Sequence, residues 1–332
     1  MNESFKGIFA SVLPNETGAH FLCNLETFWC QTTHEDSYGL SSKCLDTRIS
    51  EILVQACKEL ANGHIHIIES PILTVNKWHG NYFHFMAETL PSLIDEKDTY
   101  KYLKIRHNAL VTDTSHMWTR EALKILGHRG EVIQNLGKAV FVTDPIINSP
   151  EYLEGKPLAE LCLSLSKVRS LIMPLIENVQ ENFSDRIFIE RSPFHSHNGG
   201  SNRRLFPQDQ LKLLLNERGY SIYHLEDCSI LRQAKLFSNA NQIRAVHGAS
   251  LMNIIFCKKT CEVVEFVSEE APISTVFSLI ASALGIQNYR VIQCSSNFDT
   301  PKEEEVYFQR LGLSKNPSRL PLRLDENIAK YF

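Results

Sequence analysis

The stretch RAVHGASLMNIIFCKKTCEVVEF, residues 244–266, predicts a strand, a tight turn and a helix in direct succession. Residues 244–246 have the character of a buried strand end, and the apolar residues from Leu251 onward fall at helical spacing. Four small or polar residues stand between them: His247, Gly248, Ala249 and Ser250. A strand that turns this sharply into a helix directs free backbone N–H groups and the helix dipole at one point. Such a point favours the binding of a phosphate group.

A carboxylate stands near the end of the same stretch. Val263, Val264 and Phe266 predict the next buried strand, and Glu265 is embedded in it. In nucleotide-binding α/β folds an acidic residue at such a place bonds a ribose hydroxyl, so Glu265 is a candidate for that contact. The alternative is an ordinary glycine turn in an α/β sheet followed by a strand-end Glu, and these residues alone favour neither reading.

The surrounding sequence alternates between the two kinds of element. Strands are predicted at residues 64–70, 108–112, 139–143, 186–190, 221–225, 242–246, 263–266 and 289–293. Helices are predicted at residues 52–60, 118–126, 158–178, 207–218, 230–237 and 275–284. Regular alternation with short connections predicts an α/β fold with a parallel sheet covered by helices on both faces. Residues 1–50 show no clear period.

Length and composition are typical of a soluble globular protein. The chain has 332 residues, enough for two domains, with 43% hydrophobic residues, 22% charged residues and a net charge of −4. No strongly basic block occurs, so nucleic acid is not an expected partner. No apolar run reaches the roughly 18 residues of a membrane span, and the N-terminus lacks the apolar region of a signal peptide. The expected location is the cytoplasm.

The cysteines agree with that location. There are nine, an odd number, and they are scattered along the chain, which favours reduced thiols over a disulfide framework. Cys257 and Cys261 lie close together but have no second pair of ligands nearby, so a zinc site is not expected.

Residues 78–93, WHGNYFHFMAETLPSL, carry a second set of polar groups. In a helix, Asn81, His84 and Glu88 would share one face, and the spacing of four residues lets the side chains of His84 and Glu88 form a hydrogen bond. A carboxylate that holds an imidazole fixes its tautomer and raises its basicity, which suits a general base. Pro91 is expected to disrupt the helix because it has no N–H group. The alternative is a polar face turned to solvent.

Arginines form a third cluster. Arg191 directly follows the strand predicted at 186–190, at the carboxyl end where open α/β sheets bind ligands. Arg203 and Arg204 follow a polar segment, HSHNGGSN. Guanidinium groups bind phosphate through two parallel hydrogen bonds. The alternative for each arginine is a solvated surface position.

Taken together, these segments resemble glycosyltransferase family 61. The resemblance rests on three blocks in the order and spacing that the family shows. The blocks are Asn81-Tyr82-x-His84 with Glu88-x-Leu90-Pro91; Arg186-x-x-Ile189-x-Arg191 with Arg203-Arg204; and Gln233 with His247-Gly248-Ala249-Ser250-Leu251-x-Asn253-x-x-Phe256 and Val264-Glu265. The family commonly has a second Gly where Ser250 stands and a Trp where Phe85 stands. Ser250 can still donate its N–H and hydroxyl to a phosphate.

The resemblance implies a GT-B architecture, in which two Rossmann-like domains face each other across a cleft. Residues 1–170 would form the N-terminal, acceptor-binding domain. Residues 180–295 would form the C-terminal domain that binds the nucleotide sugar. Residues 296–332 would form a tail that is either disordered or packed back on the N-terminal domain.

The resemblance also implies an inverting transfer of a hexosyl or pentosyl group from a nucleotide sugar, with UDP as the expected nucleotide, to a saccharide acceptor. The catalytic candidates are His84 and Glu88, and His84 is preferred as the base. The acceptor candidates are Asn81 and Tyr82. The donor-binding candidates are Arg191, Arg203, Arg204, His247, Gly248, Ala249, Ser250, Asn253 and Glu265.

No cofactor and no metal are expected, because the sequence has no Asp-x-Asp motif. In the expected mechanism, Arg191, Arg204 and the helix N-terminus at Ser250 neutralise the leaving diphosphate instead. The implied setting is surface polysaccharide synthesis in a bacterium, at the inner face of the membrane if the protein associates with it peripherally. The sequence leaves the oligomeric state open.

Two rival functions remain at this stage. A nicotinamide-dependent oxidoreductase would share the fold class, but no G-x-G-x-x-G follows any predicted strand. A catalytically inactive module that binds a nucleotide or a sugar would share the donor site. The presence of all four candidate residues argues against such a loss of catalytic activity: Arg191, Glu265, His84 and Glu88.

Overall fold

The computed structural model divides the chain into two compact units, Met1–Leu153 and Glu154–Phe332. It describes residues 8–12, 20–24, 28–31, 54–55, 58–59, 62, 67–69, 72–74, 81–94, 109–111, 116–128, 131–133, 140–143, 146–148, 157–191, 204–226, 228–271, 275–310 and 320–332. The division lies before the helix at 158–172, which therefore belongs to the second unit and not to an N-terminal domain that ends at 170.

The second unit is built on a parallel sheet of five strands in the order β12-β10-β13-β14-β15. The strands are β10 (Arg186–Ile189), β12 (Ser221–Tyr223), β13 (Gln242–Val246), β14 (Glu262–Ser268) and β15 (Asn288–Cys294). In order of sequence this is 2-1-3-4-5, a doubly wound topology whose direction reverses between β10 and β13. Ligands of such sheets bind outside the carboxyl ends of the strands at that reversal.

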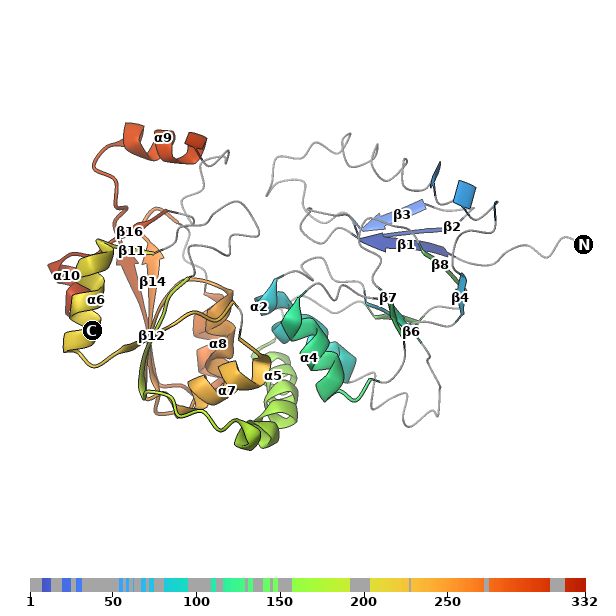
Figure 1. Cartoon of the computed structure of the whole chain (residues 1–332), viewed down its shortest axis with the longest axis horizontal. Helices are drawn as coiled ribbons and strands as arrows, with labels where there is room; N and C mark the ends of the chain where they lie inside the picture. Colours follow the sequence, from blue (N-terminus) through green and yellow to red (C-terminus); the bar gives the residue numbers. More distant parts are fainter. Residues whose placement is uncertain are drawn as a thin grey trace, which may run out of the picture. The chain divides into compact units, whose positions relative to one another are not determined.

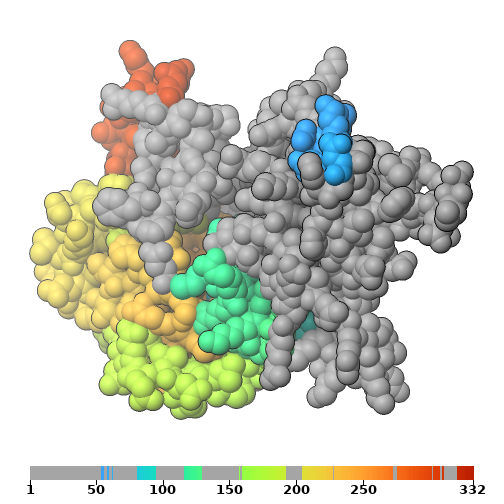
Figure 2. Space-filling model, turned by 45° about the vertical axis from the view of Figure 1, so that its right-hand side comes forward, coloured from blue at the N-terminus to red at the C-terminus, as the bar shows by residue number. Residues whose placement is uncertain are grey.

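Helices cover both faces of this sheet, as predicted. In Figure 1 one group lies on one side of β12 and β14, with α6 and α10 on the other side. The first group consists of α5 (Leu158–Ile172), η2 (Met173–Asn178), α7 (Ile230–Asn239), η3 (Ala249–Phe256) and α8 (Val276–Leu284). The second consists of α6 (Gln208–Glu217) and α10 (Glu326–Ala329). The yellow-green residues of α5 and η2 form a continuous exposed surface of this unit in Figure 2.

Local sequence signals set several of these helix ends. Gly219 and Gly285 adopt φ values of 72° and 71°, the left-handed conformation that lets glycine end a helix after α6 and α8. Pro174 lies at the start of η2, where the α-helical part of 158–178 gives way to a 3₁₀ helix. The Ser229 side chain caps α7 by accepting a hydrogen bond from the backbone N of Arg232 at 3.1 Å.

The end of the chain packs on the second unit. Strand β16 (Leu322–Arg323) pairs in parallel with β11 (Leu205–Phe206). The last residue, Phe332, joins a buried cluster with residues of α6 and of the sheet, including Phe188 and Phe266. The segment before it contains another helix, α9 (Pro301–Arg310).

The first unit contains two sheets. One has the order β3-β2-β1-β8-β4, in which only β4 and β8 pair in parallel. Its strands are β1 (Ile8–Val12), β2 (His20–Asn24), β3 (Phe28–Gln31), β4 (Ile67–Glu69) and β8 (Val140–Thr143). Strands β1, β2 and β3 were not predicted, because residues 1–50 show no clear hydrophobic period. This antiparallel meander also departs from the Rossmann-like pattern expected for residues 1–170.

The other sheet of the first unit is parallel throughout, with the order β7-β6-β5-β9. Its strands are β5 (Ile72–Thr74), β6 (Ala109–Val111), β7 (Glu131–Ile133) and β9 (Ile146–Asn148). In order of sequence this is 3-2-1-4, the order of the first four strands of a Rossmann sheet. Helix α4 (Met117–Ile125) connects β6 and β7 and ends before Gly127, as the sequence predicts. Across the described residues, none of the helices is both long and apolar enough to cross a membrane.

Candidate functional site

The segment that carries His84 is a helix with an irregular middle. Helix α2 (Tyr82–His84) continues without a break into η1 (Phe85–Thr89), a π-helical turn in which the backbone N of Leu90 bonds the carbonyl of Phe85. Residues 90–94 are helical again, so the chain passes through Pro91 without ending the helix. The sequence correctly predicts that the regular α-helix is disturbed here. It does not predict that a π turn takes up the disturbance, a feature that is frequent at functional sites.

Within this helix, His84 and Glu88 form the hydrogen bond that their spacing predicts. The distance between His84 Nδ1 and Glu88 Oε2 is 2.9 Å. The Glu88 side chain is only 2% exposed, whereas that of His84 is 22% exposed. Because an ionised carboxylate can only accept, Nδ1 carries the proton, and Nε2 keeps a lone pair. In the neutral form of the imidazole, this hydrogen bond selects the tautomer with its proton on Nδ1.

Aromatic packing holds the same helix in place. Trp118 of α4 lies edge-on to the ring of Tyr82 at 5.8 Å between centroids and against the ring of Phe85 at 4.7 Å. The side chain of Asn81 caps the helix by accepting a hydrogen bond from the backbone N of Phe83 at 2.9 Å. Asn81 and Tyr82, the predicted acceptor residues, thus have structural contacts in this helix. Asn81 is nevertheless exposed, so its side chain can also be reached by a ligand.

The second group of predicted residues meets at the topological reversal of the second sheet. Arg191 follows β10 and Gly248 follows β13, and these two strands are neighbours. A Cβ atom on Gly248 would lie 2.4 Å from Nη2 of Arg191, so the guanidinium group occupies the space that any side chain at position 248 would need. The φ of Gly248 is 167°, an extended conformation open to any residue. Glycine at this position leaves room for the guanidinium of Arg191 against the turn.

Behind this turn, a buried carboxylate holds His247. Glu265 is 0% exposed, and its Oε1 lies within hydrogen-bond distance of His247 Nδ1. The other oxygen, Oε2, accepts a hydrogen bond of 2.6 Å from the Tyr289 hydroxyl. Burial raises the pKa of Tyr289, and the Glu265 charge raises it further, so the hydroxyl keeps its proton and donates. Both oxygens of Glu265 thus have partners within the protein, and the residue orients His247; its contact with ribose stays a prediction.

The turn itself opens a 3₁₀ helix, η3, where the sequence predicts an α-helix. Its first N–H groups, those of Ala249 and Ser250, have no acceptor within the helix, as at any helix start. Asn253, a predicted donor-binding residue, is fully buried and donates from Nδ2 to Gln233 Oε1 at 2.7 Å and to the Ser250 carbonyl at 3.0 Å. Asn253 therefore shapes the turn from behind by joining it to α7.

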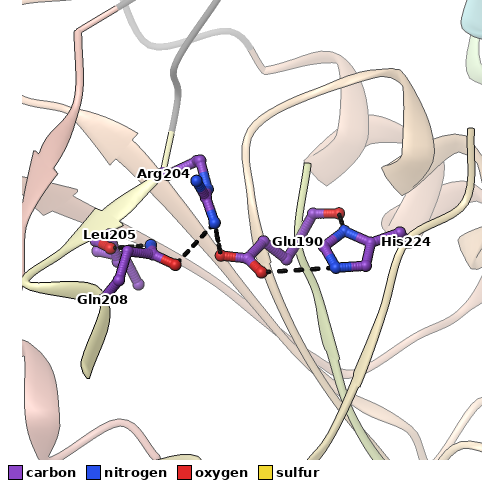
Figure 3. A network of polar contacts seen from close by, with 5 residues as sticks. All are labelled: Glu190, Arg204, Leu205, Gln208 and His224. Atoms are coloured by element: carbon purple, nitrogen blue, oxygen red, sulfur yellow. Dashed lines mark hydrogen bonds and ion pairs between the residues drawn. The ribbon is translucent and has the colours of Figure 1, made fainter. Parts of the chain in front are cut away.

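Arg204, a predicted phosphate ligand, bonds a carboxylate and a side-chain amide of the second unit. Figure 3 shows its guanidinium on the carboxylate of Glu190, with Nη2 to Oε1 at 2.8 Å and Nε to Oε1 at 3.2 Å. Nη2 also donates to Oε1 of Gln208 at 2.8 Å. The Arg204 charge therefore balances a carboxylate that is 7% exposed. The neighbouring candidate, Arg203, lies outside the described residues.

Three residues of this region were not predicted to be site residues: Tyr289, Glu190 and His224. Glu190 and His224 follow β10 and β12, and Tyr289 lies in β15 beside Glu265. No local motif marks them, because strand pairing alone brings them to the site. Among the described residues, no group of three or more His, Cys, Asp or Glu side chains could hold a metal ion.

One comparison with known proteins gives a match to this chain. The family model described as Glycosyltransferase 61 matches residues 82–264, which is more than half of the 332 residues. The match begins at the helix of His84 and Glu88 and extends through the turn at Gly248 into β14. Comparison with curated proteins finds no match. On the family match, the chain belongs to glycosyltransferase family 61.

Proposed function

We propose that this protein is an inverting glycosyltransferase that moves a hexosyl or pentosyl group from a nucleotide sugar to a saccharide acceptor without a metal ion. The observation that carries the proposal, beyond family membership, is the hydrogen bond between His84 and the buried Glu88. It supplies an imidazole oriented by a buried carboxylate, the arrangement that suits a general base for deprotonation of an acceptor hydroxyl.

In the proposed reaction, His84 Nε2 removes the proton of the acceptor hydroxyl, and the oxygen attacks the anomeric carbon. The bond from that carbon to the diphosphate oxygen breaks on the opposite face, so the configuration inverts. Glu88 keeps its charge throughout and stabilises the imidazolium that forms. Its burial strengthens this effect, because a charge interaction is stronger where solvent is excluded.

Negative charge builds up on the leaving diphosphate, and the turn after β13 offers the groups that can stabilise it. The guanidinium of Arg191 lies against Gly248, and the N–H groups of Ala249 and Ser250 begin η3. His247 adds a third donor, with its ring held by Glu265. Preorganised donors of this kind are commonly the largest single contribution to catalysis.

The wider setting is part of the same proposal. We infer a GT-B arrangement, with the acceptor bound by the first unit and the donor by the second. UDP is the nucleotide we expect. Synthesis of a surface polysaccharide in the cytoplasm, close to the membrane, is the role that the family resemblance favours.

A panel of nucleotide sugars and nucleoside diphosphates provides the direct test. A true donor should raise the melting temperature of the protein by mass action, and in the presence of a suitable saccharide it should be consumed with inversion at the anomeric carbon. Tight nucleotide binding without turnover on any acceptor or water would instead identify an inactive binding module. The absence of binding to the whole panel would contradict the proposal.

The close approach of Arg191 to Gly248 leads to a specific expectation for Gly248→Ala. The added methyl group must displace the guanidinium, whose flexible end can move without unfolding the protein. We expect affinity for nucleoside diphosphate to fall about 10-fold, the effect of one charge-assisted hydrogen bond, with little change in melting temperature. Isothermal titration calorimetry would measure it.

The control for that substitution is the double variant with Arg191→Ala. Once the guanidinium is gone, the methyl group has nothing to displace, so Gly248→Ala should have little further effect. Additive losses from the two substitutions would show that Gly248 acts independently of Arg191.

Independence from metal is a second expectation. The chain has no Asp-x-Asp motif, and Arg191 and His247 are placed to neutralise the diphosphate. Transfer should therefore persist in excess EDTA at an unchanged rate. Complete loss of activity that Mn²⁺ or Mg²⁺ restores would require a different account of the leaving group.

A further inference from the structure

In the neutral form of His224, two hydrogen-bond acceptors of the described residues face each other beyond the carboxyl ends of β10 and β12, Nε2 of His224 and Oε2 of Glu190. Nδ1 of His224 lies 3.2 Å from the backbone carbonyl of Glu190. Because a carbonyl oxygen only accepts, Nδ1 must carry the proton, and a neutral imidazole then has a lone pair at Nε2. That Nε2 faces Oε2 of Glu190 at 3.7 Å, beyond hydrogen-bond range.

The carboxylate cannot turn away to relieve this contact. Arg204 holds its other oxygen through two N–H groups, and Gln208 in turn holds Arg204, as Figure 3 shows. The backbone N of Glu190 is bonded to the carbonyl of Tyr223 at 3.0 Å, which fixes the main chain to β12. Glu190 is 93% buried, whereas the His224 side chain is 46% exposed. The pair of acceptors is thus rigid, and a ligand can reach it from the side of His224.

We propose that Glu190 and His224 bind two neighbouring hydroxyl groups of a sugar ring. One hydroxyl has a single hydrogen and can satisfy a single acceptor, so two adjacent hydroxyls are needed, one donating to Oε2 of Glu190 and one to Nε2 of His224. Removing either hydroxyl leaves a polar group without its partner, and sites of this kind discriminate strongly between a ligand and its deoxy analogue.

The position of the pair fits a sugar of the donor. Glu190 directly precedes Arg191, so a nucleotide whose diphosphate binds Arg191 brings its ribose or its transferred sugar close to this strand end. The inference rests on the proposed function, since it takes the nucleotide sugar as the ligand. It adds a subsite for which the sequence offers no motif.

Binding of UDP and of its 2′-deoxy and 3′-deoxy analogues, measured by calorimetry, tests the ribose as the ligand. The parent protein should bind UDP about 10-fold more tightly than at least one deoxy analogue, the effect of one hydrogen bond to a buried polar group. His224→Ala should abolish the preference for one hydroxyl, and Glu190→Gln should weaken the preference for the other. Tyr223→Phe, a neighbouring control whose hydroxyl lies 3.4 Å from the backbone N of Ser184, should retain both preferences.

The transferred sugar is tested by comparing UDP with the UDP-sugar that stabilises the protein most. If that sugar supplies the hydroxyls, the variants should lose the extra affinity that it contributes and keep the ribose preferences unchanged. Because the His224 side chain is exposed, it can be replaced without disturbing the fold. His224→Ala therefore tests the hydroxyl-binding site even if Glu190→Gln unfolds. Unchanged preferences of both kinds in a His224→Ala protein that binds UDP would overturn this inference alone. A parent protein that binds no nucleoside diphosphate would overturn the proposed function as well.

Discussion

Replacement of His84 by alanine should reduce the rate of sugar transfer by about 10²–10⁴-fold, the usual effect of removing a general base. Donor affinity should stay close to that of the parent protein, because the proposed diphosphate groups, Arg191 and His247, belong to the second unit. Steady-state kinetics would show the loss in kcat, and calorimetry with UDP would show unchanged binding. Glu88 holds the His84 imidazole through a hydrogen bond of 2.9 Å. Loss of this oriented base is enough to explain a fall in kcat, without a general loss of order in the helix.

Glu88→Gln separates the two possible assignments of the base. If Glu88 only orients His84, the amide should cost less activity than His84→Ala, because it can still accept a hydrogen bond from Nδ1. If Glu88 is itself the base, the loss should be as large or larger. His128→Ala, a histidine that follows α4 in the same unit, serves as the control and should keep full activity. Near-parental turnover in both His84→Ala and Glu88→Gln would contradict the assignment.

Phe332→Ala should destabilise the second unit by about 3 kcal/mol, at the low end of the range for a truncated aromatic in a core. The ring of this last residue stacks on Phe266 at 5.3 Å between centroids and also lies near Phe188 and Tyr220. Urea unfolding followed by fluorescence would measure the change.

An apolar truncation at the surface provides the matched control for that measurement. Leu213 of α6 is 64% exposed, so Leu213→Ala should change the unfolding free energy by less than about 0.5 kcal/mol. If Phe332→Ala had as little effect as the control, the end of the chain would not be part of this core. The Phe332 ring is not the only contact that holds the C-terminal segment on the second unit, because the Tyr331 carbonyl also accepts a hydrogen bond from Nε of Arg244.

The His84–Glu88 pair shows what a local pattern can predict. Residues four apart on a helix are neighbours whatever surrounds them, so the sequence alone predicted the hydrogen bond that the structure contains. It could not predict that Glu88 is buried while His84 is partly exposed, because that depends on how the helix packs against α4. The sequence could not predict the π turn before Pro91 either, since the backbone can respond to a proline in several ways.

The donor-binding candidates show the opposite case. Glu265 and Arg204 have the right chemistry for ribose and phosphate; Glu265 lies within β14, and Arg204 directly precedes β11. In the folded chain, however, Glu265 bonds His247 and Tyr289, and Arg204 bonds Glu190. Their partners are distant in sequence, and a charged side chain satisfies whichever partner the fold places nearest to it.

The sequence by itself determined the α/β class, the order of the elements between residues 207 and 293, and the turn at His247–Ser250. These follow from hydrophobic periods, glycine stops and a strand that changes directly into a helix, all of which act within a few residues. Only the tertiary structure decided the strand order, the docking of the C-terminal segment on the second sheet, and the partners of the buried charges. Those features depend on which strands pair and which faces pack, and so on contacts between residues far apart in the chain. The space for Arg191 against Gly248 belongs to this second group, because two neighbouring strands must first lie side by side.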